Sequence, residues 1–351
     1  MSSGADLRWV PLATQFPAGL DTETDPTKLR DGFTPDGYGM SIEFPGRLVS
    51  SSAVPSGTAN VVMTFDISGT TYTWFYRRLW LIDSANLNYY APEYQAIAFA
   101  QDLGKLSFDE DAEVLITFFP FAGGAMFVAK STGGYSVANA ISLGGDFQHG
   151  DMEESMKVAT AGNAIPLNGI AYASNDNGLM AWGGGAVKEI TEKVRTQLSK
   201  FQNGTLTQDA ERRRVIGTVS GTSTFVYSTA MDKLFYWTTD ATQFRYTTRT
   251  LKDRKSKPFT VRKWAVTYEN TTGSRSEISW QVKTDKDWKD QDDHIVASGT
   301  EGERKHEIIE VEDSINAEEF SLRITALPPN IQIHKIEVLI DDKTFEETPS
   351  E

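Results

Sequence analysis

The residues that could carry out acid–base or metal chemistry are few and scattered. Four histidines, His149, His294, His306 and His334, lie far apart and form no H-E-x-x-H or comparable ligand spacing. The chain has no cysteine, which excludes disulfides, a thiolate nucleophile and Cys-ligated zinc or iron–sulfur sites. We therefore predict no catalytic, metal-binding or cofactor-binding residue, and we expect the protein not to be an enzyme.

Carboxylates gather in three places. The stretch 108–113 precedes an apolar run and is typical of a solvated turn that guards a strand against aggregation, and 151–154 is expected to open a loop or short helix. The third group comprises Asp285, Asp287, Asp290, Asp292 and Asp293. Hard oxygen ligands at such spacing can wrap a calcium ion, but the sixth and twelfth positions counted from Asp285 are Asp290 and Val296, where an EF-hand needs Gly and Glu. A charged hairpin loop is the expectation and calcium binding the alternative.

Paired carboxylates on a β-propeller can also cleave glycosidic bonds, and the chain holds 8 Trp, 12 Tyr and 19 Phe. A carbohydrate-binding or glycoside-cleaving propeller is therefore an alternative function, and a cellular scaffold or adhesin module is a third. The glycine-rich stretches 122–125 and 182–185 lack the Lys-Ser or Lys-Thr of a phosphate-binding loop and indicate tight turns.

Charge is distributed unevenly along the chain. The formal net charge is −14, and residues 258–351 carry 11 Lys and Arg against 21 Asp and Glu. Such an excess of acid argues against a protein whose main task is to hold nucleic acid. A basic tract, residues 245–263, lies between the weakly charged N-terminal part and this acidic segment. Its candidate inter-subunit or DNA-facing residues are Arg245, Arg249, Lys252, Arg254, Lys255 and Lys257. The tract is expected either to pair with the acidic segment that follows it or to face DNA or an acidic partner.

Short runs rich in Val, Ile, Thr, Tyr, Phe and Trp, separated by Gly, Asn, Asp and Ser, predict an all-β fold. Before the basic tract, strands are expected at 61–67, 70–81, 114–119, 126–130, 169–174, 179–182, 214–220, 224–228 and 233–238. Hairpin clusters begin near residues 61, 114, 169 and 214, which is close to the period of four-stranded propeller blades. A β-propeller-like domain is predicted here, with a two-sheet sandwich as the rival.

After the basic tract, residues 261–268, 277–282, 306–311, 320–325 and 331–340 alternate apolar and polar side chains, as in sheets with one wet face. We predict four segments: an N-terminal extended arm and first strands (1–50), the propeller-like domain (51–257), a small C-terminal β-sandwich (258–345) and an acidic tail (346–351). Residues 190–201 carry the one clear helical stripe, and 91–100 is a weaker helix candidate. The apolar run 114–129 is too short and too rich in Pro and Gly for a spanning helix and indicates buried strands, so no membrane insertion is expected.

Two stretches carry a family resemblance. Residues 12–40 contain Asp31-Gly-Phe-Thr-Pro-Asp36, and 44–47 read Phe-Pro-Gly-Arg; the first resembles the Asp-Gly-x-x-Pro-Asp opening of tail nozzle and tail hub proteins of double-stranded-DNA bacteriophages. Those proteins continue with Arg-x-Pro-Gly, so the order differs here. Residues 164–194 are similar to a propeller hairpin of the same proteins.

The resemblance implies a structural virion protein, made in the host cytoplasm and placed in the tail. As nozzle or hub it would form a homo-oligomeric ring, expected as a hexamer, around the DNA exit channel, and would join the head-proximal adaptor to distal parts such as a fibre or spike. Double-stranded DNA would pass through it transiently, and an acidic surface suits passage because it repels phosphates. In such a ring, the basic tract of one subunit is expected to meet the acidic C-terminal domain of the next.

Overall fold

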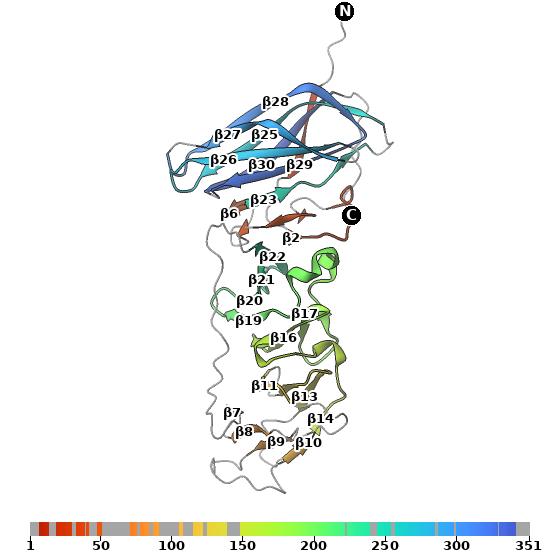
Figure 1. Cartoon of the computed structure of the whole chain (residues 1–351), viewed down its shortest axis with the longest axis vertical. Coiled ribbons are helices and arrows are strands. Elements are labelled where there is room, and N and C mark those ends of the chain that lie inside the picture. The colour runs from red at the N-terminus through yellow and green to blue at the C-terminus, as the bar shows by residue number, and fades with distance from the viewer. Residues whose placement is uncertain are drawn as a thin grey trace, which may run out of the picture. The chain divides into compact units, whose positions relative to one another are not determined.

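The computed structural model describes the chain at residues 7–13, 19–29, 33–38, 40–41, 48–50, 71–75, 78–83, 87–90, 105–107, 115–121, 125–138, 148–221, 223–238, 244–253, 257–284, 287–297, 300–328 and 330–341. These residues form antiparallel β-sheets, one short parallel pair and a few 3₁₀ helices, so the predicted all-β class is confirmed (Figure 1). The chain divides into two compact units. Unit 1 comprises 1–54, 193–197 and 233–351, and unit 2 comprises 55–192 and 198–232. Unit 2 is therefore an insertion in the sequence of unit 1.

Unit 1 is built on two six-stranded sheets. The first has the order β28 (Arg304–Ala317), β25 (Phe259–Asn270), β30 (Ile331–Asp341), β6 (Leu48–Ser50) and β5 (Met40–Ser41), with β1 (Leu7–Ala13) also on β30. The second has the order β27 (Asp287–Ala297), β26 (Ser276–Thr284), β29 (Glu319–Leu327), β23 (Phe244–Thr247) and β4 (Gly37–Tyr38), with β24 (Leu251–Lys252) also on β29. Two further short strands, β2 (Gly19–Leu20) and β3 (Phe33–Thr34), pair in parallel.

The two sheets share a core, and we call the pair the sandwich. Trp264 on β25 and Trp280 on β26 are both buried, with ring centroids 4.8 Å apart in an edge-on arrangement. Along β26, buried residues alternate with exposed or half-buried ones, which matches the predicted sheet with one wet face. Burial of the large apolar side chains on the facing surfaces supplies the main stabilisation of such a sandwich.

The sandwich takes strands from both ends of the sequence. In the pairing of β1 with β30, Trp9 lies opposite Leu339 and Val10 opposite Val338. Strand β4 pairs with β23, and β6 pairs with β30. The predicted arm at 1–50 thus supplies sandwich strands. The unit boundaries also differ from the predicted joint at 257/258, because β23 pairs with β29 and β4, and β24 pairs with β29, all of them strands of unit 1.

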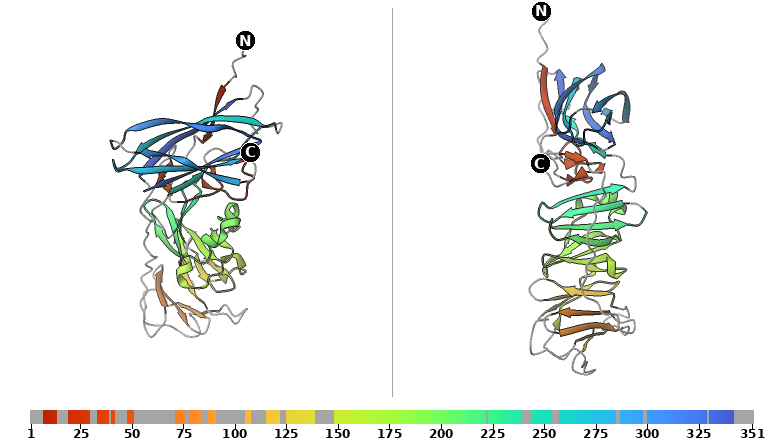
Figure 2. Two further views of the ribbon diagram at one scale, coloured as in Figure 1. Left: turned by 45° about the horizontal axis from the view of Figure 1, so that its top comes forward. Right: turned by 90° about the vertical axis from the view of Figure 1, so that its left-hand side faces the viewer.

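Four consecutive four-stranded sheets follow one another in the middle of the chain (Figure 2). The first two are β7 (Thr71–Phe75) to β10 (Lys105–Ser107), through β8 (Arg78–Asp83) and β9 (Leu87–Tyr90), and β11 (Thr117–Pro120) to β14 (Gln148–His149), through β12 (Met126–Ala129) and β13 (Gly134–Ala138). The third runs from β15 (Ala164–Leu167) through β16 (Ile170–Asn175) and β17 (Gly178–Trp182) to β18 (Lys188–Glu189). The fourth runs from β19 (Thr205–Asp209) through β20 (Arg214–Val219) and β21 (Ser223–Ser228) to β22 (Lys233–Thr238), whose residues are counted with unit 1.

Each of these sheets pairs its strands in sequence order, so neighbouring strands in a sheet are consecutive in the sequence. Between β15 and β16 the turn residues Asn168 and Gly169 have φ of +53° and +78°. A two-residue hairpin turn of this kind needs positive φ at both positions, which Asn and Gly tolerate best. The sequence therefore encodes these sheets locally.

Neighbouring sheets of unit 2 pack through aromatic and small apolar side chains. Phe121 and Phe127 contact Trp182 of the next sheet, with ring centroids 5.6 and 6.1 Å apart. Tyr172 and Tyr227 contact each other across the following pair of sheets, at 6.1 Å. The apolar run predicted as buried strands supplies β11 and β12, where Phe118, Phe119 and all of Met126–Ala129 are buried. That prediction is confirmed for the described residues.

The predicted helix at 190–201 is wrong in type. Residues Glu192–Lys200 form the 3₁₀ segment η4, interrupted by non-helical dihedral angles at Val194 and Gln197. Groups at its ends bond to other elements: the side-chain hydroxyl of Thr191 accepts from the Leu179 amide (3.3 Å), and the Lys200 carbonyl accepts from the Ser223 hydroxyl (2.6 Å). These tertiary bonds compete with the i to i−4 pattern of an α-helix. The candidates at 61–67 and 91–100 lie outside the described residues.

Candidate functional site

The basic tract singled out by the sequence enters the second sheet of the sandwich. Strand β23 pairs with β29 so that Arg245 lies opposite Thr325 and Thr247 opposite Arg323. Strand β24 places Lys252 opposite Glu319. The tract is thus held in register by backbone pairing, and its side chains meet residues of the N-terminal and C-terminal segments of the same chain.

Four of the six predicted residues lie in the described part of the chain. Arg245 Nη1 is 3.9 Å from Asp36 Oδ2, and Arg249 Nη2 donates to the Pro11 carbonyl at 3.2 Å. Lys252 Nζ is 2.8 Å from Glu319 Oε1, and this hydrogen bond raises the pKa of Lys252. Lys257 is exposed. The remaining two, Arg254 and Lys255, lie outside the described residues.

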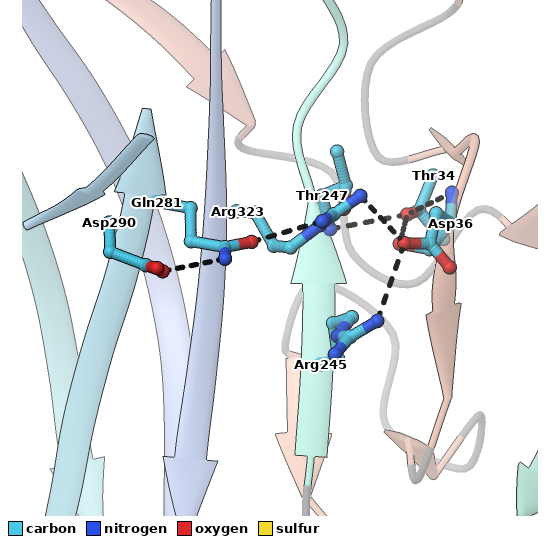
Figure 3. Close-up of polar contacts among 7 residues, drawn as sticks. All are labelled: Thr34, Asp36, Arg245, Thr247, Gln281, Asp290 and Arg323. Carbon is cyan, nitrogen blue, oxygen red and sulfur yellow. Dashed lines mark hydrogen bonds and ion pairs between the residues drawn. The ribbon is translucent and has the colours of Figure 1, made fainter. Parts of the chain in front are cut away.

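Asp36 lies at one end of a row of polar side chains that crosses the second sheet, shown in Figure 3. Its Oδ2 atom is 3.0 Å from Arg323 Nη2 and also lies near Arg245. The Arg323 and Asp36 side chains are 17% and 26% exposed, so water screens this pair less than it screens a surface ion pair. We call the set the polar row; it consists of Thr34, Asp36, Arg245, Thr247, Gln281, Asp290 and Arg323.

Arg323 uses its whole guanidinium group in this row. Its Nε donates to Thr247 Oγ1 at 3.3 Å and its Nη1 donates to Gln281 Oε1 at 3.0 Å. Gln281 Nε2 in turn donates to Asp290 Oδ1 at 2.7 Å, and the guanidinium lies 4.0 Å from the centroid of the Trp288 ring. Arg is suited to such a position because its planar fork satisfies several acceptors and stacks on an aromatic face at once.

The backbone around Asp36 is tied to β23 as well. The Thr247 amide donates to the Asp36 carbonyl at 3.1 Å, and the Thr34 hydroxyl donates to the same carbonyl at 2.8 Å. The Pro35-Asp36-Gly37 segment of the N-terminal motif therefore forms a turn whose carboxylate and carbonyl both face the C-terminal strands. The Asp36 carboxylate is paired with Arg323 and Arg245 of the same chain, so these contacts fasten the N-terminal turn to the second sheet. We call this set of contacts the latch.

The sequence pattern pointed to Arg245 as a candidate site residue, but it did not predict that Arg323 and Gln281 belong to the same polar row. Arg323 is the one basic residue in the alternating run at 320–325, which marks it only as an outward-facing position. Its partner Asp36 is far away in the sequence, and no local pattern links the two. The Asp-Gly-x-x-Pro-Asp motif, however, contains this aspartate.

Two of the acidic candidates, Glu153 and Asp290, have side-chain partners. Glu153 caps η2 (Glu154–Met156): its Oε1 accepts from the Ser155 amide at 3.3 Å and also from the Ser155 hydroxyl. Asp287 and Asp290 lie in β27, and Asp285 lies outside the described residues, as does the stretch 108–113. Within the described ranges, no three His, Asp or Glu residues are grouped as a metal site would require.

Two of the histidines contact neighbouring strands of the first sheet. His306 Nδ1 lies 2.9 Å from Thr267 Oγ1, and His334 Nε2 lies 3.2 Å from Glu269 Oε2. The His334 side chain is 10% exposed, and Arg304 Nη2 lies 3.3 Å from its Nδ1 atom.

In unit 2, Tyr227 donates to Asp232 Oδ1 at 2.7 Å, and Lys188 Nζ lies 2.6 Å from the same atom. Burial, together with the charge of Asp232, raises the pKa of the neighbouring Tyr172 to about 12 and that of Tyr227 above its usual range. Both phenols therefore stay protonated at neutral pH.

Comparison with known proteins identifies no relative. No family model and no curated protein matches the chain. Among solved structures, the extracellular domain of a hybrid two-component system from B. thetaiotaomicron aligns at 9% identity and a TM-score of 0.34, covering 72% of this chain and 44% of that one. An exo-beta-1,3-galactanase from Phanerochaete chrysosporium aligns at 12% identity and a TM-score of 0.22, covering 78% and 70%. A Bacillus thuringiensis Cry1Da tryptic core variant aligns at 8% identity and a TM-score of 0.18, covering 65% of this chain and 51% of that one.

These similarities are too low to carry an argument about fold or function. The chain spans less than half the length of the first of these proteins. Among the described residues, no helix has both the length and the apolar character that crossing a bilayer requires.

Proposed function

We propose that the chain is a structural component of the tail of a double-stranded-DNA bacteriophage, in the position of nozzle or hub, and that it has no catalytic role. The observation that carries the proposal is the layout: four consecutive four-stranded sheets inserted into a sandwich that both ends of the chain complete. This is the order of parts that the N-terminal motif and the 164–194 stretch imply through their resemblance to nozzle and hub proteins.

The four sheets are proposed to be propeller blades. They begin at Thr71, Thr117, Ala164 and Thr205, at intervals of roughly 45 residues, a length typical of four-stranded blades. The first strands β11, β15 and β19 lie next to one another in turn. Blades that pack face to face around an axis bring their first strands together in this way.

The charge of the sandwich supports a role in DNA passage rather than DNA binding. Arg245, Lys252 and Arg323 are paired with Asp36 or Glu319 of the same chain. Neutralised in this way, they offer little free positive charge to phosphates, and the net charge of the chain remains −14. A conduit with such a surface lets DNA move without holding it.

The proposal also includes a homo-oligomeric ring, expected as a hexamer, that contacts an adaptor on one side and a fibre or spike on the other. Negative-stain imaging of the purified full-length protein, with mass photometry at several concentrations, tests it. Rings with a central opening and no retention of double-stranded DNA at physiological salt are the expected result. A monomer that binds or hydrolyses oligosaccharides from a panel would overturn it in favour of a carbohydrate-active propeller.

A further inference from the structure

Strand β28 forms an open edge of the sandwich. In the first sheet β28 pairs with β25 in two stretches, from Phe259 opposite Ala317 to Val261 opposite Ile315 and from Lys263 opposite Glu310 to Glu269 opposite Arg304, with a register shift between them. Among the residues that the structure describes, no strand pairs with the other side of β28. A long edge strand of this kind presents a row of backbone donors and acceptors to another chain.

An apolar side chain stands in the middle of this edge. Ile308 is 53% exposed, more than any other large apolar residue in the described part of the chain. It is flanked on the same face by Arg304, His306 and Glu310, which are also exposed. The charges protect the edge against indiscriminate pairing, whereas the exposed isoleucine favours a specific partner.

The side chains around Ile308 on β28 are complementary when the strand pairs antiparallel with a second copy of itself. In an antiparallel ladder, residues directly opposite are either both hydrogen-bonded or both not, so only every second register is available to two copies of one strand. With Ile308 opposite its own copy, His306 lies opposite Glu310. Centring the pair on Glu307 or Glu310 instead places like charges opposite each other.

We propose that β28 pairs antiparallel with β28 of a second copy of this chain, centred on Ile308, joining two sandwiches into one continuous sheet. The contact is two-fold symmetric, so the pairing of His306 with Glu310 occurs twice. On the other side of β28, His306 and Glu310 keep their contacts with Thr267 and Lys263 of β25. A strand residue has one neighbour on each side, so the two sets of contacts are compatible.

This inference goes beyond the proposed ring. Subunits within a closed ring make head-to-tail contacts, whereas the β28 contact is isologous and pairs chains across a two-fold axis. The two can fail separately: imaging tests the ring, and the experiment below tests the strand pair.

The absence of cysteine from the sequence makes a disulfide test simple. In the full-length Ile308→Cys variant, the two introduced thiols lie opposite each other at the centre of the pair, within about 5 Å at Cβ, and should form a covalent dimer under mild oxidation. The matched control is His306→Cys on the same face of the same strand. Its two copies are offset by four residues, or about 13 Å, and should not cross-link.

Mixing His306→Cys with Glu310→Cys chains gives the register a second test, because these positions are opposite each other and should form a mixed disulfide. Ile308→Glu, which places two carboxylates opposite each other, should raise the dimer dissociation constant in analytical ultracentrifugation by about tenfold or more. Circular dichroism and thermal unfolding establish that each variant is folded, and only folded variants are compared.

Cross-linking of Ile308→Cys and of the mixture, but not of His306→Cys alone, supports the proposal. Equal cross-linking of Ile308→Cys and His306→Cys, or a wild-type chain that stays monomeric at all concentrations, overturns it.

Discussion

Arg323 and Asp36 should be energetically coupled, because their ion pair joins the N-terminal turn to a central strand of the second sheet at 3.0 Å. Replacing Arg323 by Ala removes the bonds to Asp36, Thr247 and Gln281 and the stacking on Trp288. A hydrogen bond to a charged group is worth about 1.5–3 kcal/mol and a partly exposed cation–π contact about 0.5–1 kcal/mol. Since the pair is partly screened by water, we expect a total loss of about 2–3 kcal/mol.

The coupling itself is isolated by a double-mutant cycle of Arg323→Ala and Asp36→Ala, for which we expect about 1–2 kcal/mol. Hydrogen exchange followed by mass spectrometry reports it locally, because Phe33–Thr34 and Gly37–Tyr38 should lose protection in either single variant.

The pair of Arg275 and Glu277 is the matched control. It has the same type of contact, at 2.7 Å, but its side chains are 64% and 49% exposed. Its coupling should be at most about 0.5 kcal/mol. A coupling for Arg323 and Asp36 no larger than that of the control would refute the latch, as would unchanged exchange in the N-terminal turn.

Three further predictions concern packing and pH. Trp264→Ala should destabilise unit 1 by about 3–5 kcal/mol and remove near-ultraviolet dichroism, because the buried ring fills the core between the two sheets. Gly217→Ala should cost about 1–3 kcal/mol, since its Cβ would lie 2.0 Å from the Phe225 ring, whereas Gly183→Ala, with no atom within 4 Å, should be near neutral in the same urea titration. The raised pKa of Tyr172, about 12, implies stability that is fully present below about pH 10 and lost as the pH rises towards 12, on the order of 2 kcal/mol; the Tyr172→Phe variant should lack this alkaline loss.

Strands were predictable from the sequence where their pattern is local. The run predicted at 233–238 coincides with β22, and those at 331–340 and 179–182 differ from β30 and β17 by one residue at an end. In each, alternation or a short buried run lies between Gly, Asn or Asp turns, so the signal is contained within the strand itself. The prediction of a helix at 190–201 was wrong in type because the apolar residues there follow a 3.6-residue period, whereas tertiary bonds hold the backbone in 3₁₀ turns.

Partners distant in the sequence could not be predicted. In the sequence, Arg323 is typical of a polar residue on the solvent-facing side of a strand, and Asp36 is typical of a turn residue. Only the pairing of β23 with both β4 and β29 brings them together. The basic tract was recognisable as a cluster, but whether it faced solvent, a partner or its own chain depended on that pairing.

The order of pairing has a consequence for folding. The four-stranded sheets pair strands that follow one another in the sequence, so their pairing is local and fast. The first sheet of unit 1 instead depends on β30, which pairs with β25, β1 and β6 and lies near the end of the sequence. Loop-closure entropy grows only slowly with loop length, so the long insertion costs the sandwich little stability but delays its completion. Until β30 is in place, β1 lacks its partner, β6 is paired only with β5 and β25 is unpaired on one side, so β30 joins the N-terminal strands to the rest of the core.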